Sequence, residues 1–146
     1  MTALHAAKSD TATVPVQHAL VFVMVMLSAA DAEMNDSELS LIGDIVRHLP
    51  VFSGFDLNDL TKVARDCTKH LSAPNGMHHT LHVISQSLPR HLRETAYALG
   101  CDIAAADGGV SPEEMRLLEL LRHELDLDRL HAAAIERGAR ARYLSA

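Results

Sequence analysis

Residues 104–119 read AAADGGVSPEEMRLLE, and this stretch decides the fold because it describes the end of one helix, a tight turn and the start of another helix. The alanines continue a helical pattern, and the glycine pair supplies the backbone freedom that a tight turn needs. Ser111 is a helix N-cap, Pro112 suits the first helical position, and Glu114 completes a capping box. The stretch therefore predicts a helical hairpin.

A weaker copy of this stretch lies earlier in the chain, where residues 28–43 read SAADAEMNDSELSLIG. Asp31 aligns with Asp107, and the two alanines before each aspartate coincide. In the same register Glu38 aligns with Glu114. The first copy lacks the glycine pair, and few other residues are identical. We therefore interpret the chain as two related helical halves, on the strength of pattern rather than identity.

The composition predicts an all-α protein with an aliphatic core. The chain has 146 residues, of which 48% are hydrophobic but only 3% are aromatic, and it has no Trp. This length suits one domain that buries a core without disulfides. With so few aromatic residues, the core must be built from Ala, Leu and other aliphatic side chains at helical spacing.

Apolar residues recur at helical spacing in seven segments. The first of these is apolar on both faces, so we expect it to be central. Residues 1–13 show no such period and are expected to form a flexible tail. Residues 14–146 then form a single domain, a compact bundle of about seven helices from two pseudo-symmetric repeats. The repeat halves are about 14–72 and 77–141. We expect helices over about 15–30, 36–49, 57–71, 77–87, 90–106, 111–125 and 127–140.

The charge and the apolar runs limit the classes of function. The net charge of −6 and the pI near 5.9 argue against nucleic-acid binding, which needs clustered Lys and Arg. The apolar run at residues 19–27 is shorter than the about 20 residues that cross a membrane. It aligns with a helix of the second half, so we interpret it as an internal helix and not as a signal peptide. The prediction is a cytoplasmic protein with no membrane span, whose acidic surface suits cations or basic partners.

The cysteines and histidines have simple structural interpretations. Cys67 and Cys101 fall in helical patterns and are interpreted as small buried residues. His78 and His82 stand at i, i+4 spacing, which a transition-metal pair could use, but no third ligand is evident nearby. His79 occupies the position at which a zinc protease needs Glu. We therefore interpret these histidines as a solvated or partly packed face.

Asp107 is the residue that most needs an explanation. It lies at the C-terminal end of a helix, where the helix dipole disfavours a carboxylate. Either the N–H groups of its own turn compensate the charge, or a bound cation does. A candidate metal site would use Asp107 and Glu114, and packing of the two halves could add Asp31 and Glu38. Oxygen ligands favour Ca²⁺ or Mg²⁺ over Zn²⁺. Both explanations, the cation site and the structural turn, stay open.

These residues resemble the TerB (tellurite-resistance TerB-like) family. The resemblance is carried by Ala-Ala-Asp-Gly-Gly-Val, the capped helix start and the leucine-rich helix that closes on LRHELDLD. The segments LPRHLRETAYALGCDIA and MLSAADAEMNDSELSLIGDIVRHLPVF are similar as well, so the resemblance covers about residues 14–141. The first motif departs from the family pattern, with Ala32 and Glu33 in place of the glycines. The resemblance implies a seven-helix, two-repeat fold, no known catalysis, acidic residues suspected of binding divalent metal, and an association with tellurite resistance and stress responses.

Three functions follow from these observations. The first is a non-catalytic stress-response protein of TerB type that binds a divalent cation at its acidic turns. The second is a scaffold for an unknown protein partner, in which the acidic turns are purely structural. The third is an enzyme with paired carboxylates, which has the least support because the sequence shows no nucleophile motif and no phosphate-binding loop.

Overall fold

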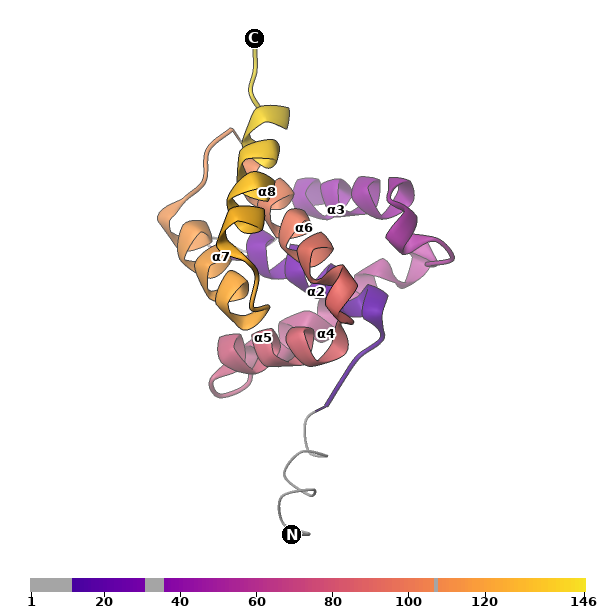
Figure 1. The fold of residues 1–146 in the computed structure, drawn as a ribbon. Coiled ribbons are helices and arrows are strands. Elements are labelled where there is room, and N and C mark those ends of the chain that lie inside the picture. The colour runs from indigo at the N-terminus through magenta and orange to yellow at the C-terminus, as the bar shows by residue number, and fades with distance from the viewer. Residues whose placement is uncertain (1–11, 31–35, 107) are drawn as a thin grey trace, which may run out of the picture.

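The structure is a computed structural model that describes residues 12–30, 36–106 and 108–146. Within these ranges the chain forms seven α-helices and three short 3-10 helices and contains no strand, which confirms the all-α prediction (Figure 1). The α-helices are α2 (Val16–Ser28), α3 (Asp36–His48), α4 (Leu60–Ser72), α5 (Gly76–Ser87), α6 (Arg93–Ala105), α7 (Pro112–Glu124) and α8 (Arg129–Arg142). The 3-10 helices are η1 (Pro50–Phe52), η2 (Leu57–Asp59) and η3 (Arg90–Leu92).

Helix α2 is the centre of the molecule, as its apolar residues on both faces predicted. Every side chain from Ala19 to Leu27 is at most 3% exposed. The helix packs against α4, α5 and α6 and makes smaller contacts with α3 and α7. Figure 1 shows α2 crossing behind α6, with the other helices around this pair. A helix that is apolar all round has to be enclosed in this way.

Helix α6 is the second core element, and it lies close to α2. A Cβ added at Gly100 would stand 3.3 Å from Cγ1 of Val23, so the glycine permits the close crossing of the two helices. Cys101 and Ala105 are buried on another side of α6, which faces α7 and α8. Small side chains thus occupy the side of α6 between α7 and α8.

The helix starts depend on side-chain caps. The predicted capping box of α7 is present, because Ser111 and Glu114 exchange side-chain to backbone hydrogen bonds. The carboxylate of Asp128 caps α8 by accepting from the N–H groups of Leu130 and His131. A helix end with such a cap satisfies N–H groups that have no partner inside the helix.

Some predicted helix starts are a few residues too early. The predicted start at residue 57 belongs to η2, which is capped by Asp56, and α4 begins only at Leu60. Residues 90–92 likewise form η3 before α6 begins. Asp128 takes the N-cap position, so α8 begins at Arg129 and not at residue 127. Apolar spacing alone does not distinguish a 3-10 turn from the first turn of an α-helix.

The N-terminal segment and the two repeat halves were also predicted from the sequence. The expected tail at residues 1–13 falls almost wholly outside the described residues, and the division into repeat halves stays a prediction. None of the helices in the described ranges is long and apolar enough to span a membrane.

Candidate functional site

The two acidic turns are only partly described by the structure. Asp31 and Asp107, two of the four predicted metal ligands, lie outside the described residues. Glu38 and Glu114 are described, and they lie in the first turns of α3 and α7. Acidic residues are favourable there because the N-terminus of a helix carries partial positive charge. The structure therefore fixes the helix ends on either side of each turn.

Glu114 performs the capping role that the sequence predicted. Its Oε1 atom accepts from the N–H of Ser111 at 2.9 Å, and its own N–H donates to Oγ of Ser111 at 3.1 Å. The residue is 7% exposed. A buried carboxylate needs hydrogen-bond partners, so the capping box is a sufficient structural reason for this glutamate. A role in metal binding would be additional to it.

The second acidic turn uses one of its glycines as predicted. Gly108 has a φ of 87°, in the left-handed region that favours glycine. Its N–H donates to the carbonyl oxygen of Ala105 at 3.0 Å, which satisfies one of the last carbonyls of α6. This hydrogen bond closes the turn between α6 and the cap of α7.

Residues that flank the two acidic turns line one pocket. Ala30 is the last described residue before the first turn, and it lines a pocket of about 390 Å³ together with Pro112 and Glu113. These two residues begin α7, directly after the second turn. The C-terminal end of α2 thus lies beside the N-terminal end of α7.

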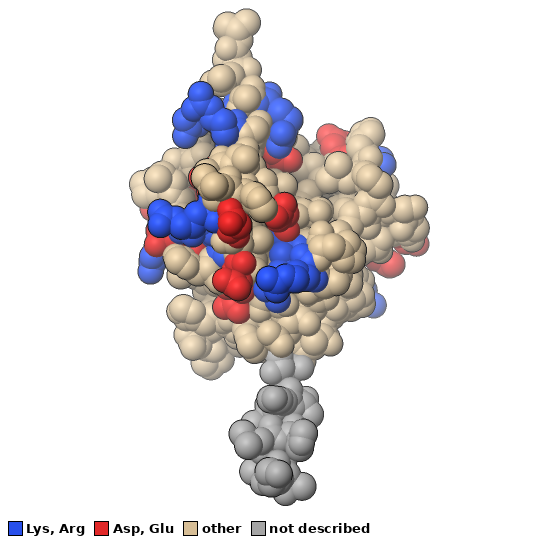
Figure 2. Space-filling view, in the orientation of Figure 1, with Lys and Arg blue, Asp and Glu red and all other residues tan. Residues whose placement is uncertain are grey.

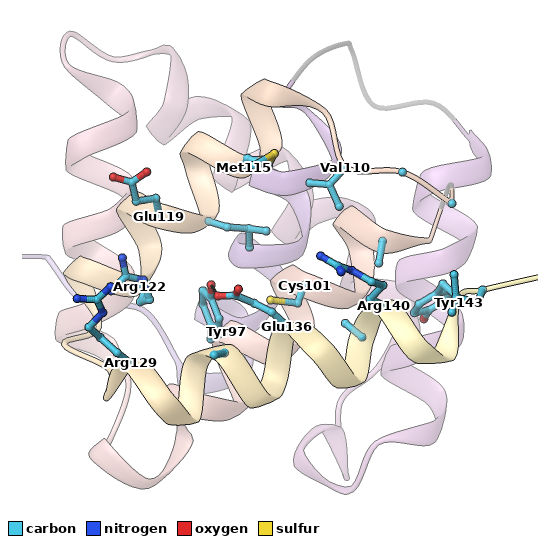
Figure 3. A pocket seen from close by; sticks show the side chains of 17 residues that line it. Tyr97, Cys101, Val110, Met115, Glu119, Arg122, Arg129, Glu136, Arg140 and Tyr143 are labelled. Carbon is cyan, nitrogen blue, oxygen red and sulfur yellow. Dashed lines mark hydrogen bonds between the residues drawn. The ribbon is translucent and has the colours of Figure 1, made fainter.

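A larger pocket lies between α6, α7 and α8, and we call it the α7–α8 pocket (Figure 3). Its volume is about 690 Å³. Both α7 and α8 pack on α6 but hardly contact each other, so a trough remains between them. The apolar part of its lining includes Cys101 and Ala105 from α6, Met115 and Leu118 from α7, and Ala133 and Ala139 from α8. The sequence did not predict this pocket, and its sign in the sequence is the recurrence of small residues on α6 and α8.

The reactive groups of the α7–α8 pocket are held in their neutral forms. The hydroxyl of Tyr97 donates to the carboxylate of Glu136 at 2.5 Å, and burial together with this hydrogen bond raises the pKa of Tyr97 well above its usual range. Burial, with the negative charge of Glu136 as the next cause, raises the pKa of the Cys101 thiol to about 12. A protonated thiol is a poor nucleophile. At neutral pH both groups therefore carry their protons.

The histidines form pairs that the sequence did not predict. His79 Nε2 lies 3.0 Å from Nδ1 of His70 on α4, and the two rings are stacked. His82 faces Glu124 of α7 at 3.7 Å. No group of three or more His, Cys, Asp or Glu side chains that could hold a metal occurs among the residues for which the structure gives positions. His78, His79 and His82 are exposed and His70 is half-buried, in agreement with the interpretation of a solvated or partly packed face.

Comparison with known proteins identifies the family. A family model described as tellurite resistance protein TerB matches residues 17–137. The chain belongs to the TerB family and is therefore a tellurite-resistance-associated protein. This match confirms the resemblance that the motif of the second acidic turn indicated. No curated protein and no solved structure matches the chain.

Proposed function

We propose that this TerB protein is a non-catalytic, cytoplasmic stress-response protein that binds a divalent cation at its paired acidic turns. The ligands would come from Asp31 and Glu38 in one half of the chain and from Asp107 and Glu114 in the other. Ca²⁺ or Mg²⁺ is the preferred ion, because these hard cations take carboxylate and carbonyl oxygens.

The observation that supports the proposal is that residues flanking the two acidic turns line one pocket. Ala30, which precedes Asp31 in the chain, lines this pocket together with Pro112 and Glu113, which begin the helix after Asp107. Carboxylates that approach each other repel, and each aspartate follows the C-terminal end of a helix in the sequence, where the helix dipole is negative. A cation shared by the two turns would offset both the repulsion between the carboxylates and the unfavourable interaction with the helix dipoles. Such a site exists only in the folded chain, so binding would stabilise the fold.

A thermal melt with EDTA, Ca²⁺, Mg²⁺ or Zn²⁺ tests this proposal. An ion present at about 100 times its dissociation constant stabilises the fold by about 2.7 kcal/mol, and Ca²⁺ or Mg²⁺ should raise the melting temperature by several degrees. Asp107→Asn should remove the rise and leave the melting temperature in EDTA unchanged. Glu119→Gln removes an equal charge from an exposed site on α7 and serves as the matched control.

Two outcomes would contradict cation binding. One is the lack of any shift with millimolar ions, and the other is an Asp107→Asn variant that melts early even in EDTA. Either result favours the alternative function, a protein-interaction scaffold whose acidic residues serve as caps. The capping box between Ser111 and Glu114 is the specific observation in favour of that alternative.

A further inference from the structure

The α7–α8 pocket has a mostly apolar lining with arginines at both ends, and Tyr97 and Glu136 lie between the Arg122 end and Cys101 (Figure 3). Arg122 lies in the last turn of α7, and Arg129 is the first residue of α8. Both arginines line the pocket, at the same end of it in Figure 3. Val110 and Tyr143 bound the opposite end, where Arg140 is also found.

The charges that line the pocket are not balanced. The two acidic side chains already have partners, because Glu136 accepts from the hydroxyl of Tyr97 and Glu119 pairs with Arg116 at 3.4 Å. In contrast, the guanidinium groups of the three lining arginines form no hydrogen bond or ion pair with any residue that the structure describes. These arginines are Arg122, Arg129 and Arg140.

The basic residues here do not form a broad patch. Figure 2 shows blue and red side chains interleaved on the face formed by α7 and α8. Such a surface lacks the extended positive field that nucleic acid or an anionic membrane requires. The unpaired arginines are instead suited to a local anionic group, since a guanidinium binds carboxylate or phosphate through two parallel hydrogen bonds.

We propose that the α7–α8 pocket binds a small amphipathic anion with a carboxylate or phosphate headgroup. The headgroup is held by Arg122 and Arg129, and the apolar part lies along the trough over Cys101, Leu118 and Ala133. This ligand site is separate from the proposed cation site and adds a second binding function to the protein.

The size and lining of the pocket support a small molecule as the occupant. Its volume of about 690 Å³ lies within the range of about 300–1,000 Å³ that is typical of ligand pockets. Such pockets combine an apolar lining with a few polar groups that fix orientation. An amphipathic helix would need a longer open groove, whereas this trough is bounded at one end by the turn at residues 108–110.

Tyrosine fluorescence reports directly on this pocket. The chain has two tyrosines and no Trp, and both tyrosines line the pocket. We would titrate the full chain with decanoate in EDTA, so that the result is independent of cation binding. A saturable fluorescence change is expected. Decanol should bind at least about tenfold more weakly, and acetate and inorganic phosphate should give no change at the same concentrations. Decyl phosphate in place of decanoate decides between the two headgroups.

Substitutions separate the two parts of the site. The double variant Arg122→Gln and Arg129→Gln should weaken decanoate binding by about tenfold or more and abolish the preference over decanol. Arg137→Gln, on α8 but outside the pocket lining, should bind as the unmodified chain does. Ala133→Phe should fill the trough and block both decanoate and decanol, while Ala134→Phe, on the neighbouring exposed position, should not.

Clear results would overturn the inference. Equal affinity for decanoate and decanol would contradict the proposed headgroup site. Normal decanoate binding by the double arginine variant would contradict it as well. If neither decanoate nor decyl phosphate changes the tyrosine fluorescence, the proposed small-molecule site is wrong. Binding of an acidic amphipathic peptide in that case would assign the trough to a protein partner.

Discussion

At the scale of single residues, burial decides which groups of this protein can react. Cys67 is fully buried, and its thiol donates to the carbonyl oxygen of Phe22 at a sulfur to oxygen distance of 3.7 Å. Cys101 is 3% exposed at the base of the α7–α8 pocket. Burial raises the pKa of both thiols to about 12. Both cysteines are thus small packing residues, as the sequence predicted.

The thiols should therefore be inert in the folded protein. At pH 8 a disulfide reagent such as dithionitrobenzoate should react with neither cysteine on the timescale of minutes, because reaction needs an accessible thiolate. In guanidinium chloride both should react at once. An Ala134→Cys variant, with an exposed thiol, is the positive control. Fast native reaction that Cys101→Ser abolishes would show that the pocket opens to its base.

Local sequence patterns predicted the roles of residues within one segment, but they did not predict contacts between side chains of different helices. The cap formed by Ser111 and Glu114 lies within four consecutive residues, so the sequence contains all of its geometry. The hydrogen bond from Tyr97 to Glu136 joins α6 to α8 and depends on how these helices are rotated. No spacing rule within one segment carries that information.

At the scale of elements, α8 depends on its N-terminal cap. The helix has few buried residues, Ala132 and Ala139, so packing contributes less to it than to α2. The carboxylate of Asp128 accepts from N–H groups of Leu130 at 2.9 Å and of His131 at 3.1 Å. The hydrogen bond from His131, followed by that from Leu130, lowers the pKa of Asp128 below its ordinary value of 3.8. Because α8 forms one side of the α7–α8 pocket, this cap also supports the pocket.

The cap of α8 should make a stability contribution that depends on pH. The pKa of Asp128 is lower in the folded chain than in the unfolded chain, so its contribution is fully present above the ordinary value and is lost as the pH falls through the lowered one. Asp128→Asn keeps a good cap but removes the titration, whereas Asp128→Ala removes both. At pH 7 we expect the alanine variant to melt a few degrees below the unmodified protein.

Urea denaturation at pH 7 and at pH 3 checks this prediction. The difference in midpoint between the unmodified chain and Asp128→Asn should shift in favour of the variant on acidification. Asp59→Asn is the control, because Asp59 stands at the N-cap of α4 without a side-chain cap bond. An equal pH effect in both variants would show that the cap of α8 does not titrate as expected.

At the scale of the whole molecule, one central helix pair supports two candidate sites. The sequence predicted the central place of α2 from its two apolar faces, and the packing of α2 on α6 agrees with this. It did not predict the trough between α7 and α8, because the divergence of two helices depends on side chains from a third. The turn at residues 108–110 adjoins both sites, since it follows Asp107 and also lines the α7–α8 pocket.

This shared turn predicts that the two proposed ligands affect each other. A cation held by Asp107 would fix the conformation of the turn, and Gly108, Gly109 and Val110 would then be set in place for the pocket. Less ordering would remain for the second ligand, so decanoate should bind more tightly in Ca²⁺ than in EDTA, by about fivefold or more. Linkage requires that decanoate tighten Ca²⁺ binding by the same factor.

The two titrations, decanoate with and without Ca²⁺ and Ca²⁺ with and without decanoate, measure the factor independently. The Asp107→Asn variant should bind decanoate with the same affinity in Ca²⁺ and in EDTA, because the ion then no longer binds the turn. Glu119→Gln changes the same charge on the pocket lining and should retain the coupling. If both ligands bind but neither changes the affinity of the other, the turn does not couple the two sites, and they are independent.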